Sequence, residues 1–293
     1  MSLHAYDWAD DAIRPGDLRT VPGRHLVALD LDGTTLHHDG HLAEVVRLAV
    51  GRAVARGHHV VVATGRAAPS ALPVIRQLGL PRGYAVCSNG AVTIALDPRQ
   101  PDGYRTVQTV TFDPAPVLRL LRGAWPDAHV AVEEAGLGFR VNAPFGRFEL
   151  AGGVRVVSWQ ELLTTPATRV TFRSPTATAE DFVTLAERLG LHGVNYAVGY
   201  TAWLDISPDG VSKASALEGV RRSLRVPRRR TVAVGDQRND IEMLRWAECG
   251  VAMAQAPLPV QVAARLVTGP VEADGLVPVL EALPPTAPRP WRG

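Results

Sequence analysis

The sequence predicts an α/β protein, with a parallel β-sheet between helices and a second, α+β module inserted into it. Two observations support this prediction. Near both ends of the chain, short continuous apolar runs alternate with segments whose apolar residues recur at helical spacing, which is typical of strands buried on both faces. Over residues 91–208, the strand-like segments alternate apolar with polar residues instead, which is typical of a sheet with one face in water.

Residues 25–63 predict the first βαβ unit. The run HLVALDLDG at 25–33 has the length of a strand and closes with aspartate and glycine. Residues 41–56 place leucine, valine and alanine at helical spacing, and Gly57 ends this helix. The β-branched run at 59–63 follows. A strand, a helix and a strand in this order predict two parallel strands.

The remaining elements define the domain organisation. In the inserted module we expect strands at 104–112, 129–134 and 168–173 and helices at 115–125 and 178–190. From Val211 the first pattern resumes, with helices at 214–224 and 240–246 and a buried strand at 231–236. We therefore predict a core of residues 23–90 and 209–283, an inserted module of residues 91–208, and poorly ordered arms at 1–22 and 284–293.

Composition and charge exclude several classes of partner. With 31 basic and 29 acidic residues the net charge is +2, which does not favour nucleic acid or an anionic membrane. The basic run at 221–230 is interpreted as a solvated helix end rather than a nucleic-acid site. No apolar stretch reaches the roughly 18 residues of a membrane span, and no signal peptide is visible, so we expect a cytoplasmic protein. Cys87 and Cys249 are expected to be reduced thiols in the core.

The use of basic residues singles out one position. Lys213 is the one lysine in the chain, and the other 30 basic residues are arginines. A bias that replaces lysine by arginine should spare lysine where a compact ammonium cannot be exchanged for a planar guanidinium. Lys213 is therefore a candidate functional residue, and its position at a helix start leads us to expect it near solvent.

Four predicted strands end in polar residues, and the ends of parallel strands are where ligands bind in α/β sheets. The four segments are Asp30–Thr35, Thr64–Arg66, Ser88–Gly90 and Gly235–Asp240. They contain the carboxylates of Asp30, Asp32, Asp236 and Asp240. Crowded carboxylates need a cation, and oxygen ligands without histidine or cysteine favour Mg²⁺ over zinc. Such a site suits the binding and polarisation of a phosphoryl group.

The motifs, in this order, resemble the haloacid dehalogenase superfamily of phosphohydrolases. They are DxDGT at 30–34, TGR at 64–66, the lysine after GVS, and GDxxND at 235–240. SNGA at 88–91, SPDGVSKASAL at 207–217 and GDQRNDIEML at 235–244 are similar to the Cof-type branch. The resemblance implies a Rossmann-like parallel-sheet core with an inserted α+β cap that sets substrate specificity.

The resemblance also implies a role for each motif residue. Asp30 is expected to be the nucleophile that forms an aspartyl-phosphate, and Asp32 the acid and base. Mg²⁺ would be bound by Asp30, Asp236 and the backbone carbonyl of Asp32. The substrate-binding residues implied are Thr64, Gly65, Arg66, Asn89, Lys213 and Asn239, of which Thr64 and Lys213 also count as catalytic. Asp240 would orient Lys213 or a metal-bound water from behind. Ala254 and Gln255 depart from the glycine and asparagine usual there, and Ala214 from a glycine.

We therefore expect a magnesium-dependent phosphatase that acts on a small phosphomonoester, with a sugar phosphate favoured. A phosphosugar mutase is the nearest alternative, because it differs only in whether the phosphoryl group passes to water or returns to the sugar. A phosphate-binding regulatory module with little turnover is less favoured, since each catalytic position is filled. Trp125, Trp159 and Trp203 are expected in a core rather than an interface, and the sequence does not predict the oligomeric state.

Overall fold

The computed structural model describes residues 13–14, 16–135, 138–146, 150, 153–174, 178, 181, 194–198 and 203–286. These residues form two compact units. Unit 1 comprises residues 1–63, 77–83 and 217–293, and unit 2 comprises residues 64–76 and 84–216. The predicted boundaries of core and inserted module, near residues 90 and 209, stay a prediction.

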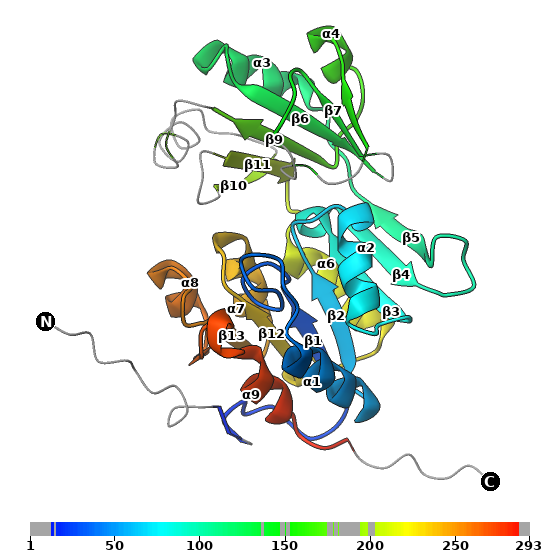
Figure 1. The fold of residues 1–293 in the computed structure, drawn as a ribbon, viewed down its shortest axis with the longest axis vertical. Helices are drawn as coiled ribbons and strands as arrows, with labels where there is room; N and C mark the ends of the chain where they lie inside the picture. Colours follow the sequence, from blue (N-terminus) through cyan, green and yellow to red (C-terminus); the bar gives the residue numbers. More distant parts are fainter. Residues whose placement is uncertain are drawn as a thin grey trace, which may run out of the picture. The chain divides into compact units, whose positions relative to one another are not determined.

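The strands of unit 1 confirm the predicted parallel sheet (Figure 1). Their order is β14-β13-β12-β1-β2, and each neighbouring pair is parallel. The strands are β1 (Leu26–Leu29), β2 (His59–Ala63), β12 (Thr231–Gly235), β13 (Cys249–Met253) and β14 (Leu266–Thr268). All residues of β1, β12 and β13 are buried, as expected for apolar runs in a sheet covered on both faces.

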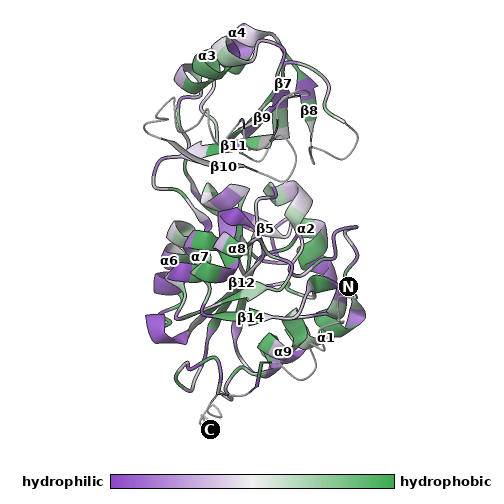
Figure 2. Cartoon of the chain, turned by 90° about the vertical axis from the view of Figure 1, so that its left-hand side faces the viewer, coloured by the Kyte–Doolittle hydropathy of each residue, from purple (hydrophilic) through white to green (hydrophobic). Residues whose placement is uncertain are grey.

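The helices of unit 1 bury one face each. They are α1 (Glu44–Ala55), α7 (Ile241–Trp246), α8 (Leu258–Ala263) and α9 (Leu276–Glu281), and α6 (Lys213–Ser223) begins in unit 2 and ends in unit 1. Figure 2 shows hydrophobic and hydrophilic residues side by side on α1 and α6. Helix α1 begins three residues later than predicted, because Ala43 is extended and has no side-chain cap. The side chain of Arg56 donates 2.7 Å to the carbonyl of Leu280, which ties α1 to α9.

Unit 2 contains a β-hairpin and a six-stranded sheet. The hairpin joins β4 (Val92–Leu96) to β5 (Tyr104–Thr109), after β3 (Gly83–Cys87) and α2 (Ala68–Gln77). The order of the six-stranded sheet is β10-β11-β9-β6-β7-β8. Its strands are β6 (His129–Glu134), β7 (Gly138–Val141), β8 (Val154–Val156), β9 (Arg169–Arg173), β10 (Val194–Val198) and β11 (Trp203–Pro208).

Two helices cover one face of the six-stranded sheet, α3 (Ala115–Ala124) and α4 (Trp159–Leu162) (Figure 1). Leu118 and Leu121 from α3 and Leu162 from α4 pack on the inward residues of β6, β9 and β11. Trp125 and Trp159 pack against this cluster, which confirms that they belong to a core. The side chain of Trp203 and the helix predicted at 178–190 lie outside the described residues.

The prediction that one face of β6 and β9 is exposed to water is wrong. Four residues of each strand are buried, including the polar Glu133, Arg169 and Thr171. The face that carries them is covered in part by Ala67, which belongs to a second apolar cluster with Ala131 and Phe139. Polar residues alternate along these strands because they bond to each other and to loops, and not because they meet water.

Three further predictions concern the N-terminal arm, the two cysteines and membrane-spanning helices. Leu18 is 1% exposed, and the amide of Val21 donates to the carbonyl of Arg229, so these two residues of the predicted N-terminal arm contact the folded part of the chain. Cys87 and Cys249 are buried free thiols as predicted, and burial raises the pKa of Cys87 to about 12. Among the described residues, no helix is long and apolar enough to cross a membrane.

Candidate active site

Three carboxylates meet at one edge of the unit 1 sheet. Asp30 follows β1 and Asp236 follows β12, two neighbouring parallel strands in which Leu29 is paired with Val234. Because parallel strands end at the same edge, the two side chains come together, and Asp240 joins them from the next turn. One oxygen of each carboxylate lies within 4.8 Å of the other two. Asp30 is 4% exposed, and Asp236 and Asp240 are fully buried.

The loop after β1 packs closely on Asp236. Gly33 has a positive φ of +80°, and a Cβ there would lie 2.8 Å from the carboxyl carbon of Asp236. The hydroxyl of Thr34 donates 3.0 Å to Oδ1 of Asp236. The hydroxyl of Thr35 donates to the backbone carbonyl of Asp30. Gly33 thus lets the loop approach Asp236 closely, and the two threonine hydroxyls bond it to Asp236 and to the backbone of Asp30.

Asp240 holds the turn that follows β12. Its Oδ2 accepts the backbone amides of Asp236 and Gln237, both at 3.0 Å. The side chain of Gln237 bonds back in a reciprocal capping box. Gly235 is required beside it, since a Cβ there would lie 2.5 Å from the carboxyl carbon of Asp240. Asp240 thus orients the backbone of Asp236 directly.

The donor set fits a hard divalent cation. Three buried carboxylates would repel one another strongly in a medium of low dielectric constant, and a bound cation removes that cost. All three offer oxygen, and short aspartate side chains leave room for water in the coordination shell. The site is therefore suited to a divalent metal ion with oxygen ligands.

Asp32 and Asn239 lie outside this group of three carboxylates. Asp32 is exposed, two residues after Asp30, and Asn239 is half-buried in the 3₁₀ turn Arg238–Asp240. An exposed carboxyl is accessible to a substrate, whereas Asp30 is buried where the strand ends. The two aspartates of the DxD motif therefore differ in environment, as different chemical roles require.

Gln255 is a supporting residue that sequence reasoning did not assign. Its side-chain nitrogen donates 2.6 Å to the carbonyl of Gly33, and its oxygen accepts the amide of Val271 at 3.0 Å. One amide side chain thus links the loop after β1 to the segment after β14. The signal in the sequence was the departure from the asparagine usual at this position, which the structure explains as a link between two loops.

The other predicted site residues belong to unit 2, where two loops bond to each other. The buried Thr64 accepts the amide of Asn89 at its carbonyl, at 3.1 Å, and the amide of Arg66 at its hydroxyl, at 3.0 Å. The carbonyl of Arg66 accepts the amide of Ser88 at 2.9 Å. The structure therefore brings Thr64, Arg66 and Asn89 together.

The second of these loops also packs on the start of α6. Gly90 has a φ of +107°, and a Cβ there would lie 2.5 Å from the carbonyl carbon of Ser212 and 3.2 Å from the amide of Lys213. Lys213 is 1% exposed, so the expectation that it lies near solvent is wrong. A helix start need not be at the surface when a loop covers it. Burial of the one lysine strengthens the argument that its ammonium is needed there.

The comparisons with known proteins agree with these motifs. The pattern of the haloacid dehalogenase-like hydrolase family matches residues 27–121 and 160–280, more than half of the chain. The Bacillus subtilis protein 5-amino-6-(5-phospho-D-ribitylamino)uracil phosphatase YitU is 27% identical over 266 residues, which cover 88% of this chain and 96% of that protein. The HMP-PP phosphatase of Serratia proteamaculans is 30% identical over 241 residues, covering 79% and 84%.

The fold comparison leads to the same family. A solved structure of a haloacid dehalogenase-like hydrolase from B. subtilis aligns with a TM-score of 0.75 and 24% identity. The alignment covers 88% of this chain and 99% of that one. Likeness at this identity establishes the fold, and the family match adds the motifs. The chain therefore belongs to the haloacid dehalogenase-like hydrolase family.

Proposed function

We propose that this chain is a magnesium-dependent phosphatase that hydrolyses a small phosphomonoester through an aspartyl-phosphate. The observation that carries the proposal is the group of three buried carboxylates, with Asp30 at the end of the central strand β1. The relatives of this chain include phosphatases of small phosphorylated metabolites, such as the pyridoxal phosphate phosphatase YbhA of Escherichia coli. These support the reaction class for the present chain.

In the first half-reaction, a carboxylate oxygen of Asp30 attacks phosphorus, and the bond from phosphorus to the leaving oxygen breaks. Asp32 donates its proton to that oxygen, so the product leaves as a neutral alcohol. In the second half-reaction, Asp32 takes a proton from water, and the water oxygen attacks the phosphorus of the aspartyl-phosphate. Inorganic phosphate leaves, and the Asp30 carboxylate and the Asp32 acid are restored.

The remaining residues bind and orient the phosphoryl group. Mg²⁺ held by Asp30, Asp236 and the carbonyl of Asp32 would neutralise charge on the phosphoryl oxygens and favour the ionised form of the nucleophile. Thr64 offers a hydroxyl, Asn89 and Asn239 offer amides, and Lys213 offers a compact positive charge. We propose that these groups act on the same phosphoryl group as the carboxylates.

The substrate we propose is a sugar phosphate or a metabolite of similar size. A phosphosugar mutase remains the second candidate, because the same aspartyl-phosphate could return its phosphoryl group to a sugar hydroxyl. The two differ in product. With a hexose phosphate as substrate, a phosphatase releases inorganic phosphate in step with substrate loss, whereas a mutase yields an isomeric sugar phosphate.

The proposal is tested by turnover of p-nitrophenyl phosphate and of a panel of phosphorylated metabolites. We expect activity to vanish in a strong chelator and to return with Mg²⁺. Ca²⁺ should bind without supporting turnover, because its larger, looser shell does not hold the nucleophile in line with the phosphoryl group. Full activity in the chelator would exclude this mechanism.

A further inference from the structure

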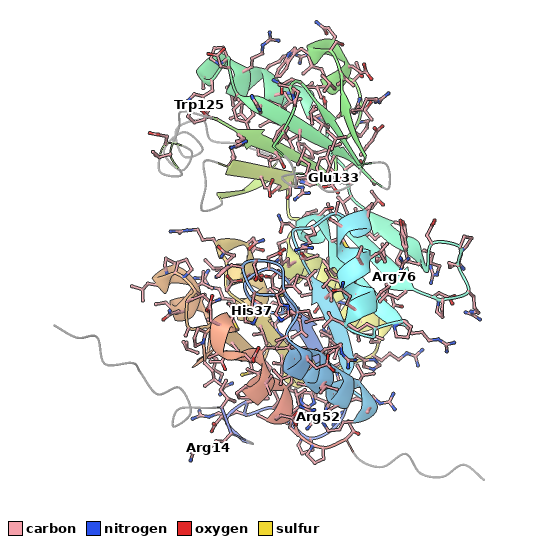
Figure 3. The ribbon with its side chains drawn as sticks, viewed as in Figure 1. Arg14, His37, Arg52, Arg76, Trp125 and Glu133 are labelled. Carbon is pink, nitrogen blue, oxygen red and sulfur yellow. The ribbon has the colours of Figure 1, made fainter. Side chains whose placement is uncertain are left out.

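A buried ion pair in unit 2 has no part in the proposed chemistry. Glu133 on β6 and Arg169 on β9 are directly opposite in the antiparallel register. Nε of Arg169 lies 2.9 Å from Oε2 of Glu133, and the two side chains are 9% and 4% exposed. Figure 3 labels Glu133 near the end of β6, which is an inner strand of the six-stranded sheet. Because an isolated charge is costly to bury, the other groups that Glu133 and Arg169 bond to show what this ion pair holds in place.

The second contact of each partner is a loop that carries proposed site residues. Oε1 of Glu133 accepts the hydroxyl of Ser88 at 2.6 Å. Nη1 of Arg169 donates 2.7 Å to the carbonyl of Gly65. Ser88 precedes Asn89, and Gly65 follows Thr64. One ion pair therefore bonds both loops at the positions adjacent to the two proposed phosphate-binding residues.

The loop at Ser88 needs such support. Ser88 and Asn89 have φ values of +50° and +53°, in the left-handed region. Asparagine tolerates this region, but for serine it is sterically strained. Strained residues persist when their surroundings hold them. The Ser88 hydroxyl bond to Glu133 and the Ser88 amide bond to Arg66 are two such restraints.

The surroundings of Arg169 hold its guanidinium in place. Burial opposes the charge of Arg169, but Glu133 and Asp205 outweigh it and hold the pKa of the guanidinium above its usual value. Asp205 lies 3.5 Å from Nη1 of Arg169 and accepts the hydroxyl of Thr171 at 2.6 Å. The guanidinium also lies 5.4 Å from the centre of the Phe139 ring. Glu133, Asp205 and Phe139 therefore all contact the Arg169 guanidinium on the same face of the sheet.

We propose that Glu133 and Arg169 are positioning residues for phosphate binding, which transmit the geometry of the six-stranded sheet to the loops of Thr64 and Asn89. This inference rests on the proposed function, because it assigns those loops to the phosphoryl group. The two residues act through Ser88 and Gly65 and do not touch the substrate. Loss of the Glu133 charge should therefore misplace the loops by a fraction of an ångström without unfolding the sheet.

The adjacent residue provides a matched control. Glu134 points to the opposite sheet face, because successive residues of a strand alternate in direction. It pairs with the buried Arg140 at 3.4 Å, and Arg140 bonds to the carbonyl of Glu161 in α4 rather than to a loop of the site. Glu134→Gln thus weakens a second ion pair of the same strand and leaves the two loops untouched.

The first experiment compares Glu133→Gln with Glu134→Gln in the full chain. The readouts are kcat and KM for p-nitrophenyl phosphate, the Kd of inorganic phosphate by calorimetry in Mg²⁺ buffer, and the melting temperature. A misplacement of about 1 Å can cost on the order of 10²-fold in rate. We therefore expect Glu133→Gln to lower kcat/KM at least about 10-fold and to raise the phosphate Kd, whereas Glu134→Gln changes both less than about 2-fold.

A second experiment tests the left-handed loop without removing a charge. Ser88→Ala and Ser88→Gly both delete the hydroxyl that Glu133 accepts, but glycine adopts a positive φ at no steric cost. If the bond serves to hold that conformation, Ser88→Gly should recover more phosphate affinity than Ser88→Ala. Glycine no better than alanine would argue that the hydroxyl itself is needed, and so against a positioning role.

The outcomes separate this inference from the proposed function. Equal changes in Glu133→Gln and Glu134→Gln, in step with their melting temperatures, would show a purely structural pair and overturn the inference while leaving the phosphatase intact. If the wild-type protein hydrolyses no phosphomonoester, the proposed function fails. The phosphate Kd of the variants then still decides whether the pair positions the loops.

Discussion

Lys213 shows how one residue links composition to the site. A chain with 30 arginines and one lysine has kept that lysine in a position that is 1% exposed. A buried ammonium requires negatively charged or polar partners, and under the proposed function a bound phosphoryl group would be one of them. Sequence reasoning found this residue, but its burial depended on Gly90, whose contact with Ser212 could not be deduced from spacing.

We expect Lys213→Arg to lower kcat by about 10²-fold although the charge is retained, because a larger planar group displaces the phosphoryl group or the metal. Since the site is buried, we also expect a loss of about 1–3 kcal/mol from overpacking, unlike the small effect expected of an exposed lysine. Turnover of p-nitrophenyl phosphate and thermal melting measure the two effects. Near-normal turnover would mean that the lone lysine has no catalytic role.

At the same scale, the residues that sequence analysis missed are those whose role is a contact between distant segments. Asp30, Asp32, Asp236 and Asp240 were predicted together because they follow strands, and the structure groups the carboxylates of all but Asp32. Gln255 and Glu133 were not predicted, because their partners, Gly33 and Ser88, lie 222 and 45 residues away in the sequence. The periodicity of a strand indicates its faces, but it does not identify a partner on another element.

Strand periodicity predicted where the strands lie in the sequence better than it predicted whether their faces are buried. β2 and β6 have the predicted bounds, and α1 differs mainly at its start. The wet face predicted for β6 and β9 failed, because alternation of polar residues is the same for a face in water and for a face with an internal ion pair. Burial of a polar face depends on tertiary partners, which a local pattern does not contain.

The packing of the Ser88–Gly90 loop on α6 gives a prediction at this scale. Gly90→Ala places a Cβ against Ser212 and forces a strained φ, so we expect at least about 1–3 kcal/mol of lost stability and a lower kcat. Gly79→Ala is the control, since Gly79 also has a positive φ, of +71°, but nothing within 4 Å of the added Cβ. Equal melting temperatures for the two variants would contradict the close packing.

For the whole molecule, the sequence predicted the parallel sheet because its strands are buried on both faces and therefore read as continuous apolar runs. It also predicted strands at 129–134 and 168–173, where the structure has β6 and β9. The family model matches the chain on both sides of residues 122–159 but not within them. These residues lie in the predicted inserted module, where the sequence matched no motif. The sequence did not indicate which residues of the predicted inserted module, 91–208, would contact a substrate, because specificity residues follow no shared pattern.

Stability of the whole molecule should depend on pH through a buried histidine pair. His58 is 4% exposed, and its Nδ1 accepts the amide of His25 at 3.2 Å. Burial, followed by the positive charge of His25, lowers the pKa of His58 to about 4. Histidine in the unfolded chain has a pKa near 6.5. The contribution of neutral His58 to the free energy of unfolding is therefore complete above about pH 6.5, and it is lost as the pH falls from about 6.5 to 4.

We expect this group to cost at most about 2 kcal/mol between pH 7 and pH 5. His58→Asn should flatten part of the profile, because an amide oxygen can accept the same bond and does not titrate. Urea unfolding at the two pH values measures the difference. A wild-type stability that is independent of pH, or an equal slope in the variant, would contradict this account.

If Asp30 is the nucleophile of a metal-dependent phosphatase, removal of its charge alone should stop turnover. Asp30→Asn keeps the shape of the side chain and removes the attacking charge. Asp39→Asn, at an exposed residue of the following loop, is the control. We expect p-nitrophenyl phosphate turnover with Mg²⁺ to be abolished in Asp30→Asn, with a native melting curve, and unchanged in Asp39→Asn. More than a few per cent of wild-type turnover in Asp30→Asn would mean that Asp30 is not the nucleophile.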